Sequence, residues 1–386
     1  MERNKSVTIV GAGPGGLTAA INLAKNGYEV NLYEQNNDVG LRFKGEFQGL
    51  ENWSDDEDTL KILDRLGIKV NFLCYPYSGD DCLFIGPNRK KVKVKTSRPL
   101  FYLVERVTGE SAAVGSLDNG LKKQAEEAGV NILWNHKLDS INDNLAIVGT
   151  GPKAADAIAK GIVFKTSHKN IAIGFVDNRI APKAYAYLLV NEGKATFATC
   201  IYEDFKNEKM YFERALKVLN SSIEIDINDA KEFGGFANFF NEPIVAKNNI
   251  LYIGENAGFQ DVLWGFGIKY AMFSGYYAAQ SIMNNQDYTE LCRKNLFPKF
   301  KASLANRWLF SHLYNPGYTI MFNAMARLDD VIPALRNHYN TSLHKRIAYN
   351  VAKRWYKTRL IDKQCMHKNC DCVWCRHGKN AQMDLN

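Results

Sequence analysis

Two glycine-rich segments far apart in the chain carry its clearest chemical signal. The first, Gly11-Ala12-Gly13-Pro14-Gly15-Gly16, follows a short β-branched run that ends at Val10. The second, which begins Gly254-Glu255-Asn256-Ala257-Gly258, follows the apolar run 250–253. Glycine turns of this kind bring backbone N–H groups close to phosphate oxygens. One such segment near each end of a long chain indicates a single extended dinucleotide.

The first segment has the spacing of a dinucleotide fingerprint. Gly11 makes the tight turn, Gly13 lets the backbone approach a pyrophosphate, and Gly16 lets the following helix pack closely on the strand. Glu34 ends the next predicted strand, eighteen residues after Gly16. An acidic side chain at that position would accept hydrogen bonds from the ribose hydroxyls of an adenosine.

Length and composition restrict the class of protein. The chain has 386 residues, more than one core usually supports, so two or three subdomains are expected. Its 46% hydrophobic and 12% aromatic residues exclude a disordered chain. It has no run of eighteen apolar residues, and a strand that begins at residue 7 leaves no room for a signal peptide, so we expect a cytoplasmic protein. Its eight cysteines are then expected to be thiols or metal ligands.

Positive charge is concentrated in the last quarter of the chain. From residue 286 onward there are 17 Lys and Arg against 7 Asp and Glu, a surplus of ten, whereas the whole chain carries +8. This segment is also rich in aromatic residues. Such a mixture is typical of a nucleic-acid surface or an anionic membrane surface. The alternative is a set of amphipathic helices with Lys and Arg on the solvent side.

The order of the predicted elements indicates an α/β protein. A Rossmann-type parallel sheet is expected over residues 1–75, 101–161 and 245–285. Successive β-type segments without helices predict an antiparallel sheet, and hence a second domain, over 76–100 and 162–244. A basic aromatic helical region over 286–360 and a Cys/His-rich tail over 361–386 complete the chain.

The layout resembles the flavoprotein fold shared by p-hydroxybenzoate hydroxylase and the geranylgeranyl reductases, and is most similar to the reductases. Three segments carry the resemblance: 11–16 with Glu34, 181–190 and 254–274. The middle segment is similar to the reductases' Pro-x-x-Tyr-x-Trp-x-Phe-Pro signature, which lines the substrate cavity that faces the flavin. The likeness covers about residues 1–285.

The resemblance implies a bound FAD and two sets of site residues. Glu255 takes the position of an Asp that holds the ribityl hydroxyls, and backbone N–H groups of 263–268 would stabilise negative charge on the reduced flavin. The cofactor-binding set is Gly11, Gly13, Gly15, Gly16, Glu34, Arg42, Arg106, Gly254, Glu255, Gly265, Gly267 and Ile268. The substrate set is Tyr185, Tyr187, Leu189, Trp264 and Phe266.

Tyr185 and Tyr187 alternate along one predicted strand and therefore share a face. They are the candidate catalytic residues, as a cavity wall with a phenol able to donate a proton. The alternative is that both are ordinary core residues. Tyr187 replaces the Trp and Leu189 the Phe of the reductase signature, so the resemblance implies a cavity without naming its substrate.

The expected function is an FAD-dependent oxidoreductase that reduces carbon–carbon double bonds of a hydrophobic isoprenoid or lipid, with peripheral membrane contact through the basic region. A flavin-dependent monooxygenase of the same fold is the first alternative. A flavin redox sensor with a metal-stabilised C-terminal module is the second. The Asp-Gly pair of the hydroxylases is replaced by Gly149-Thr150-Gly151-Pro152, and the chain has one G-x-G-x-x-G. Both facts favour a separate electron donor over direct docking of NADPH.

The C-terminal tail adds a second chemical signal. Cys365, Cys370, Cys372 and Cys375 lie within eleven residues, and His367 or His377 could replace one of them. Thiolates and imidazoles in this number suit zinc or an iron–sulfur cluster. The spacing matches no standard zinc finger or ferredoxin, so a reactive thiol tail or a redox pair stays open as the alternative.

Overall fold

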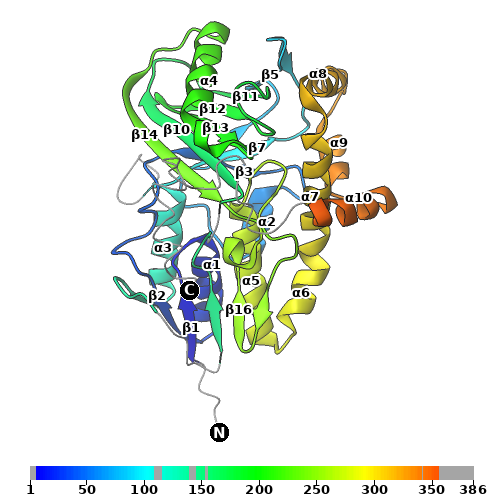
Figure 1. The fold of residues 1–386 in the computed structure, drawn as a ribbon. Coiled ribbons are helices and arrows are strands. Elements are labelled where there is room, and N and C mark those ends of the chain that lie inside the picture. The colour runs from blue at the N-terminus through cyan, green and yellow to red at the C-terminus, as the bar shows by residue number, and fades with distance from the viewer. Residues whose placement is uncertain (1–5, 108–114, 139–144, 153–154, 341, 356–386) are drawn as a thin grey trace.

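The computed structural model describes residues 6–107, 115–138, 145–152, 155–340 and 342–355. Figure 1 shows two stacked sheet regions, with a band of C-terminal helices running along one side of both. The chain leaves the Rossmann region for the second sheet twice, and it returns finally at residue 246, before the C-terminal helices begin.

The Rossmann-type sheet is parallel except at one edge. Its order is β15 (Ala246–Lys247), β16 (Ile250–Tyr252), β9 (Ala146–Val148), β1 (Ser6–Val10), β2 (Glu29–Tyr33) and β8 (Asn131–Leu133), with β15 antiparallel to β16. Ile9 lies beside both Leu32 and Ile147, and all three are fully buried. Helices α1 (Pro14–Lys25), α3 (Leu117–Glu127) and α5 (Ile268–Asn284) belong to this region. Parallel strands that helices cover on both faces are typically apolar on both faces.

Helices α1 and α5 pack backbone against backbone. A Cβ atom on Gly275 would overlap the carbonyl oxygen of Gly15, and one on Gly15 would lie 2.8 Å from that of Ala271. Only glycine permits so close an approach. The contact places the N-terminus of α5 beside that of α1, which joins the two glycine-rich segments in space.

The second sheet is antiparallel except for the β5–β11 pair. Its order is β14 (Asn228–Ala237), β10 (Ala157–Lys165), β13 (Lys194–Ile201), β12 (Ala186–Asn191), β11 (Ile171–Phe175), β5 (Cys82–Ile85) and β6 (Lys91–Lys93). Helix α4 (Glu208–Ser222) covers β10 and β13. The boundary that we expected at residue 162 falls inside β10, because the strand begins at Ala157. We therefore place the boundary before β10.

A small antiparallel sheet lies between the two regions, in the order β3 (Phe47–Glu51), β7 (Phe101–Glu105) and β4 (Tyr75–Tyr77). The chain then enters α2 (Thr59–Arg65) later than the acidic run 55–58 suggests. Asp58 is the N-cap and accepts from the N–H of Leu60 at 2.9 Å. Asp55 instead forms ion pairs with Lys269 and Lys299, which holds it outside the helix.

The C-terminal region is helical, as expected. Its helices are α6 (Tyr288–Asn295), α7 (Phe297–Ser311), α8 (Tyr314–Met325), α9 (Ile332–Tyr339) and α10 (Leu343–Trp355). Helix α7 contacts α6, α9 and α10. Several aromatic residues of this region, including Phe310, Tyr318 and Phe322, are buried and do not lie on the outer surface. No helix in the described ranges is long and apolar enough to cross a membrane.

Candidate cofactor and substrate cavity

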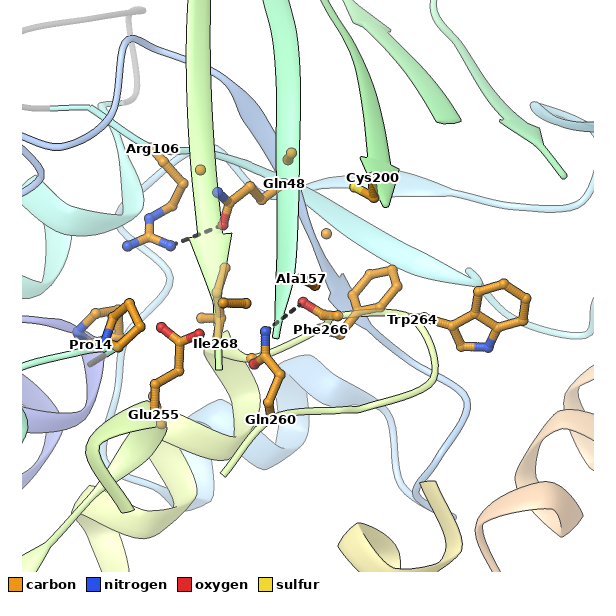
Figure 2. Close-up of a pocket in the computed structure, with 18 of the residues that line it drawn as sticks. Pro14, Gln48, Arg106, Ala157, Cys200, Glu255, Gln260, Trp264, Phe266 and Ile268 are labelled. Atoms are coloured by element: carbon orange, nitrogen blue, oxygen red, sulfur yellow. Dashed lines mark hydrogen bonds between the residues drawn. The ribbon is translucent and has the colours of Figure 1, made fainter. Parts of the chain in front are cut away.

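One cavity of about 1350 Å³ is lined by residues of the Rossmann region, the second sheet and the C-terminal helices. Every residue of the two predicted site sets lines it, from Gly11 and Glu34 of the Rossmann region to Tyr187 and Leu189 of the second sheet. Figure 2 shows part of this wall, with Glu255, Gln260 and Arg106 directed into the same space. A drug-sized ligand usually occupies a pocket of about 300–1000 Å³. The cavity therefore has room for a dinucleotide and part of a second molecule.

The glycines of the first turn have two different roles: Gly11 and Gly16 permit close packing, and Gly13 borders open space. Gly11 has φ of +100°, and a Cβ atom there would lie 2.5 Å from the carbonyl oxygen of Gly149. A Cβ atom on Gly16 would overlap the carbonyl oxygen of Gly11. Gly13 differs, because nothing lies within 4 Å of its Cβ position. No side chain caps the N-terminus of α1. This cradle fits a pyrophosphate, whose oxygens would accept from the free N–H groups.

Glu34 is held rigidly at the cavity wall. Its Oε2 accepts from the backbone N–H of Ala12 at 2.9 Å, and its Oε1 accepts from Asn36 at 3.0 Å from the backbone and 2.7 Å from the side chain. Each carboxylate oxygen has two lone pairs. The arrangement leaves acceptor capacity for ribose hydroxyls.

Two arginines flank the same part of the cavity. Arg106 is buried and forms a bidentate pair with Asp118, at 2.8 and 2.9 Å, while its Nη1 donates to Gln48 at 3.0 Å. Arg42 and Arg106 both lie over the ring of Phe43, with centroid distances of 4.9 and 4.0 Å. Fixed cations of this kind could neutralise phosphate charge.

Glu255 points its carboxylate into the cavity between Pro14 and Ile268 (Figure 2). Burial raises the pKa of this carboxyl, while Arg42 and Arg106 oppose the rise. A hydrogen bond from the backbone of Asn238 also opposes the rise. A carboxylate can accept several hydrogen bonds, so this one fits the hydroxyls of a ribityl chain as well.

The loop 261–267 also lines the cavity, through residues 263–267. Side chains that are distant in the sequence hold it in place. Gly265 has φ of +78°, and its N–H donates to the carbonyl oxygen of Asp261 at 2.8 Å. The hydroxyl of Tyr185 donates to the carbonyl oxygen of Trp264, and that of Tyr202 donates to Val262 at 2.8 Å. The predicted proton donor Tyr185 therefore uses its own proton to hold this loop.

The C-terminal helices fasten the same loop through Asp261. This carboxylate accepts from Ser303 of α7 at 2.5 Å, from Tyr339 of α9 at 3.1 Å, and from the N–H of Trp264 at 3.0 Å. Burial raises the pKa of Asp261 to about 6, although these hydrogen bonds oppose the rise.

A buried arginine makes the second connection. Arg307 of α7 is 1% exposed, and it donates to the carbonyl oxygens of Leu263 and Lys183. Its guanidinium also lies over the rings of Tyr202 and Phe310, at 4.2 and 5.0 Å. One side chain of α7 thus connects the loop 261–267 with the segment that joins β11 to β12.

The C-terminal helices also wall the far arm of the cavity, which sequence reasoning missed. The lining there is mostly apolar, with Asn306, His338 and Tyr339 as its polar members; the apolar residues are Leu309, Phe310, Leu313, Met321, Phe322, Met325, Leu328, Val331, Ala334 and Leu335. Their apolar spacing predicted helices with a buried face. It did not reveal that this face borders a cavity, because core and cavity linings have the same composition.

Two further residues near the flavin-type motifs were also missed. Glu46 lines the cavity, is 3% exposed, and accepts from the N–H of Lys44 at 2.6 Å. Burial raises its pKa. Gln260 donates to the carbonyl oxygen of Gly265 at 3.2 Å and supports the loop from below (Figure 2). Gln260 lies within the second glycine-rich motif, so its position was the available signal.

The predicted metal ligands, Cys365, Cys370, Cys372 and Cys375 with His367 or His377, lie outside the described residues. Within the described ranges, His, Cys, Asp and Glu side chains form no group that could hold a metal ion. Cys74, Cys82, Cys200 and Cys292 are free thiols.

Comparison with known proteins identifies related sequences. Residues 9–51 match the family model of an NAD(P)-binding Rossmann-like domain. The chain is similar to a digeranylgeranylglycerophospholipid reductase of Methanococcus vannielii, with 26% identity over 349 residues, 81% of this chain and 84% of the relative.

Solved structures share the fold. A geranylgeranyl bacteriochlorophyll reductase-like protein of Thermoplasma acidophilum superposes with a TM-score of 0.66 at 18% identity, over 90% of this chain and 95% of the other. A flavin-dependent brominase superposes with a TM-score of 0.63 at 15% identity, over 90% of this chain and 98% of the other. At these identities the likeness shows the fold alone.

Proposed function

We propose that this chain, an FAD-dependent oxidoreductase of the geranylgeranyl reductase family, saturates carbon–carbon double bonds of an isoprenoid lipid. The single observation that carries the proposal is the lining of the cavity. Its polar end has the cradle and carboxylates that suit a dinucleotide, and the same cavity includes the apolar arm that the C-terminal helices line. The sequence likeness to a reductase over most of both chains favours this chemistry over others of the same fold.

The residues of the polar end would hold FAD along its whole length. Gly13 and the N-terminus of α1 would bind the pyrophosphate, Glu34 the adenosine ribose, and Glu255 the ribityl chain. The N–H groups of loop 261–267 and the first turn of α5 would face the ring. Bound and reduced FAD supplies a hydride. The protein supplies position, a dry pocket and a proton.

Tyr187 is the residue that we assign to the proton. It lines the cavity, and burial raises its pKa well above the ordinary range, so the phenol keeps its proton at neutral pH. Tyr185, whose hydroxyl is engaged with Trp264, positions the loop instead. Tyr187→Phe is therefore expected to lower turnover about 100-fold without changing FAD affinity. Equal losses in FAD affinity and turnover would assign Tyr187 to binding.

The electron donor is proposed to be a separate protein or small carrier. The chain has one G-x-G-x-x-G, and Gly149-Thr150-Gly151-Pro152 lines the cavity where the hydroxylases carry Asp-Gly. We further propose that the enzyme meets its lipid at a membrane surface. A zinc or iron–sulfur site at the C-terminal cysteines remains a separate proposal, which metal analysis of the purified protein would test.

The decisive experiment is an anaerobic visible spectrum of the purified protein, followed by product analysis. We expect a flavin band that dithionite bleaches and that returns when an isoprenoid lipid is added, with the lipid gaining one H₂ for each saturated double bond. Absence of a flavin band after incubation with FAD would refute the proposal.

The monooxygenase is the alternative that the fold by itself permits, as the brominase neighbour illustrates. It predicts rapid bleaching by NADPH, oxygen consumption and a product that has gained oxygen. Reoxidation by lipid without oxygen would exclude it.

A further inference from the structure

Helix α10 carries an apolar stripe that nothing in the described ranges covers. Leu343, Ile347, Val351 and Trp355 are 74%, 60%, 41% and 62% exposed. They follow one another at intervals of four residues, so they form one band along the helix. The opposite face, with Tyr349 and Ala352 buried, packs on α7. The helix is thus apolar both toward the protein and away from it.

The stripe continues into the mouth of the cavity. The ring of Trp355 lies 5.6 Å from that of His312, at the end of α7. The next residue, Leu313, and the preceding turn's Leu309 both line the cavity, yet they are 40% and 44% exposed. The exposed apolar surface therefore runs from α10 to the open edge of the apolar arm. Figure 1 shows α10 at the outer side of α7, away from both sheets.

The charges beside the stripe are positive. Helix α10 contains four Lys and Arg and no Asp or Glu in the sequence LHKRIAYNVAKRW. Lys345 donates to the backbone of Asn337 and Asn340, and Lys353 pairs with Glu242 at 2.6 Å. Arg346 and Arg354 are exposed. Arg354 follows Ile347 by seven residues and so lies along the stripe, and Arg346 lies one turn from Leu343.

We propose that the stripe of α10, together with Leu309 and Leu313, is a docking surface for an anionic lipid bilayer. The apolar side chains enter the acyl region, and Arg346 and Arg354 bind lipid phosphates, as in an interfacial amphipathic helix. The inference rests on the proposed function, because a lipid substrate explains why the surface ends at the cavity mouth. A lipid could then pass from the bilayer into the apolar arm without crossing water.

Other occupants fit the surface less well. In a symmetric dimer through α10 the same patch would meet itself, which would bring Arg346 and Arg354 toward their own copies. A nucleic acid would be bound by stacked aromatic rings, whereas three of the four stripe residues are aliphatic.

The test is flotation of the full-length, FAD-loaded protein with vesicles of phosphatidylcholine alone or mixed with phosphatidylglycerol. We expect binding to the mixed vesicles. Ile347→Asp should weaken it about tenfold, since the apolar insertion is lost and a repelling charge is added. Arg346→Gln and Arg354→Gln should each weaken it about fivefold, because each removes one cation at the lipid surface.

Matched controls carry the same changes elsewhere. Val70→Asp places the charge on an exposed apolar residue of the Rossmann region, and Lys217→Gln removes a cation from α4; neither should alter binding. Equal binding of Ile347→Asp and wild type would overturn the proposal. So would equal binding to both vesicles, a dimer in solution that Leu343→Asp dissociates, or binding that appears only after residues 356–386 are removed.

Lipid reduction in detergent separates the two proposals. If the wild-type enzyme reduces detergent-dispersed lipid but does not float with vesicles, the docking surface is wrong and the proposed function stands. If the protein floats as expected but never reduces an isoprenoid lipid, the docking surface stands and the proposed substrate is wrong. We expect Ile347→Asp to keep its activity in detergent and to lose activity only on vesicle-borne lipid.

Discussion

The two ends of the cavity are built in different ways. At the pyrophosphate end, one local segment forms the cradle, and Gly11, Gly13 and Gly16 act through missing side chains. At the ring end, the loop 261–267 is held by Tyr185, Ser303, Arg307 and Tyr339, which lie far away in the sequence. The first end is a backbone device and the second is a side-chain network. Single substitutions should therefore cause large losses of stability or FAD affinity at the first end and smaller losses at the second.

The largest effect is expected from two alanine substitutions in the glycine turn. Gly16→Ala forces a Cβ atom into the carbonyl oxygen of Gly11, so we expect a loss above about 5 kcal/mol, the entire stability of many proteins. Gly13→Ala meets nothing within 4 Å, and its φ of −78° suits alanine, so the apoprotein should stay folded. Its FAD affinity should fall about 100-fold, or about 3 kcal/mol. Thermal unfolding and flavin titration measure the pair; destabilised Gly13→Ala apoprotein would contradict the distinction.

At the ring end, Arg307→Leu should destabilise the protein by about 4 kcal/mol, because the buried carbonyl oxygens of Leu263 and Lys183 lose a charged donor. Arg307→Lys should recover part of the loss. Denaturant unfolding gives the values, and the flavin spectrum reports the loop. Arg293→Leu, at an exposed ion pair, is the control and should change stability by less than about 0.5 kcal/mol. An equal loss in both would mean that Arg307 has no special connection to the loop.

The third prediction concerns pH. The folded pKa of Asp261, about 6, lies above the ordinary value of 3.8, so the folded state binds the extra proton between these pH values. This group's contribution to stability therefore falls as pH rises from about 4 to 6, by at most about 3 kcal/mol. Asp261→Asn cannot titrate. The difference in unfolding free energy between wild type and variant should change across this window and be constant above it; a flat difference would show that Asp261 has an ordinary pKa.

The smallest expected effect is that of Tyr185→Phe. It removes one hydrogen bond to the carbonyl oxygen of Trp264, worth about 1 kcal/mol, and should shift the flavin absorption as the loop relaxes. The pH dependence of turnover should not change if Tyr185 only positions the loop. Loss of one limb of the pH profile would instead make Tyr185 the proton donor.

The extent of prediction from sequence follows the same division. The strand–glycine–helix unit, Glu34, Tyr185 and Tyr187 were chosen from local spacing, and all of them line one cavity. The acidic run 55–58 predicts a helix that begins at Asp55, but α2 begins at Thr59, because a buried ion pair between Asp55 and Lys269 overrides the preference of acidic residues for a helix N-terminus. The apolar arm was missed, since residues such as Met321 and Leu335 look the same in sequence whether they face a core or a cavity.

The sequence by itself determined the backbone cradle, because φ, steric room and N–H direction are properties of a few consecutive residues. Only the tertiary structure decided which helices close the cavity and which side chains hold its loop. Arg307 and Asp261 act on partners dozens of residues away in the sequence. No local pattern records these contacts, because they form only when α7 packs against the loop 261–267. The exposed stripe of α10 is the same case, since the sequence of an apolar helix face does not say whether another element covers it, and none in the described ranges does.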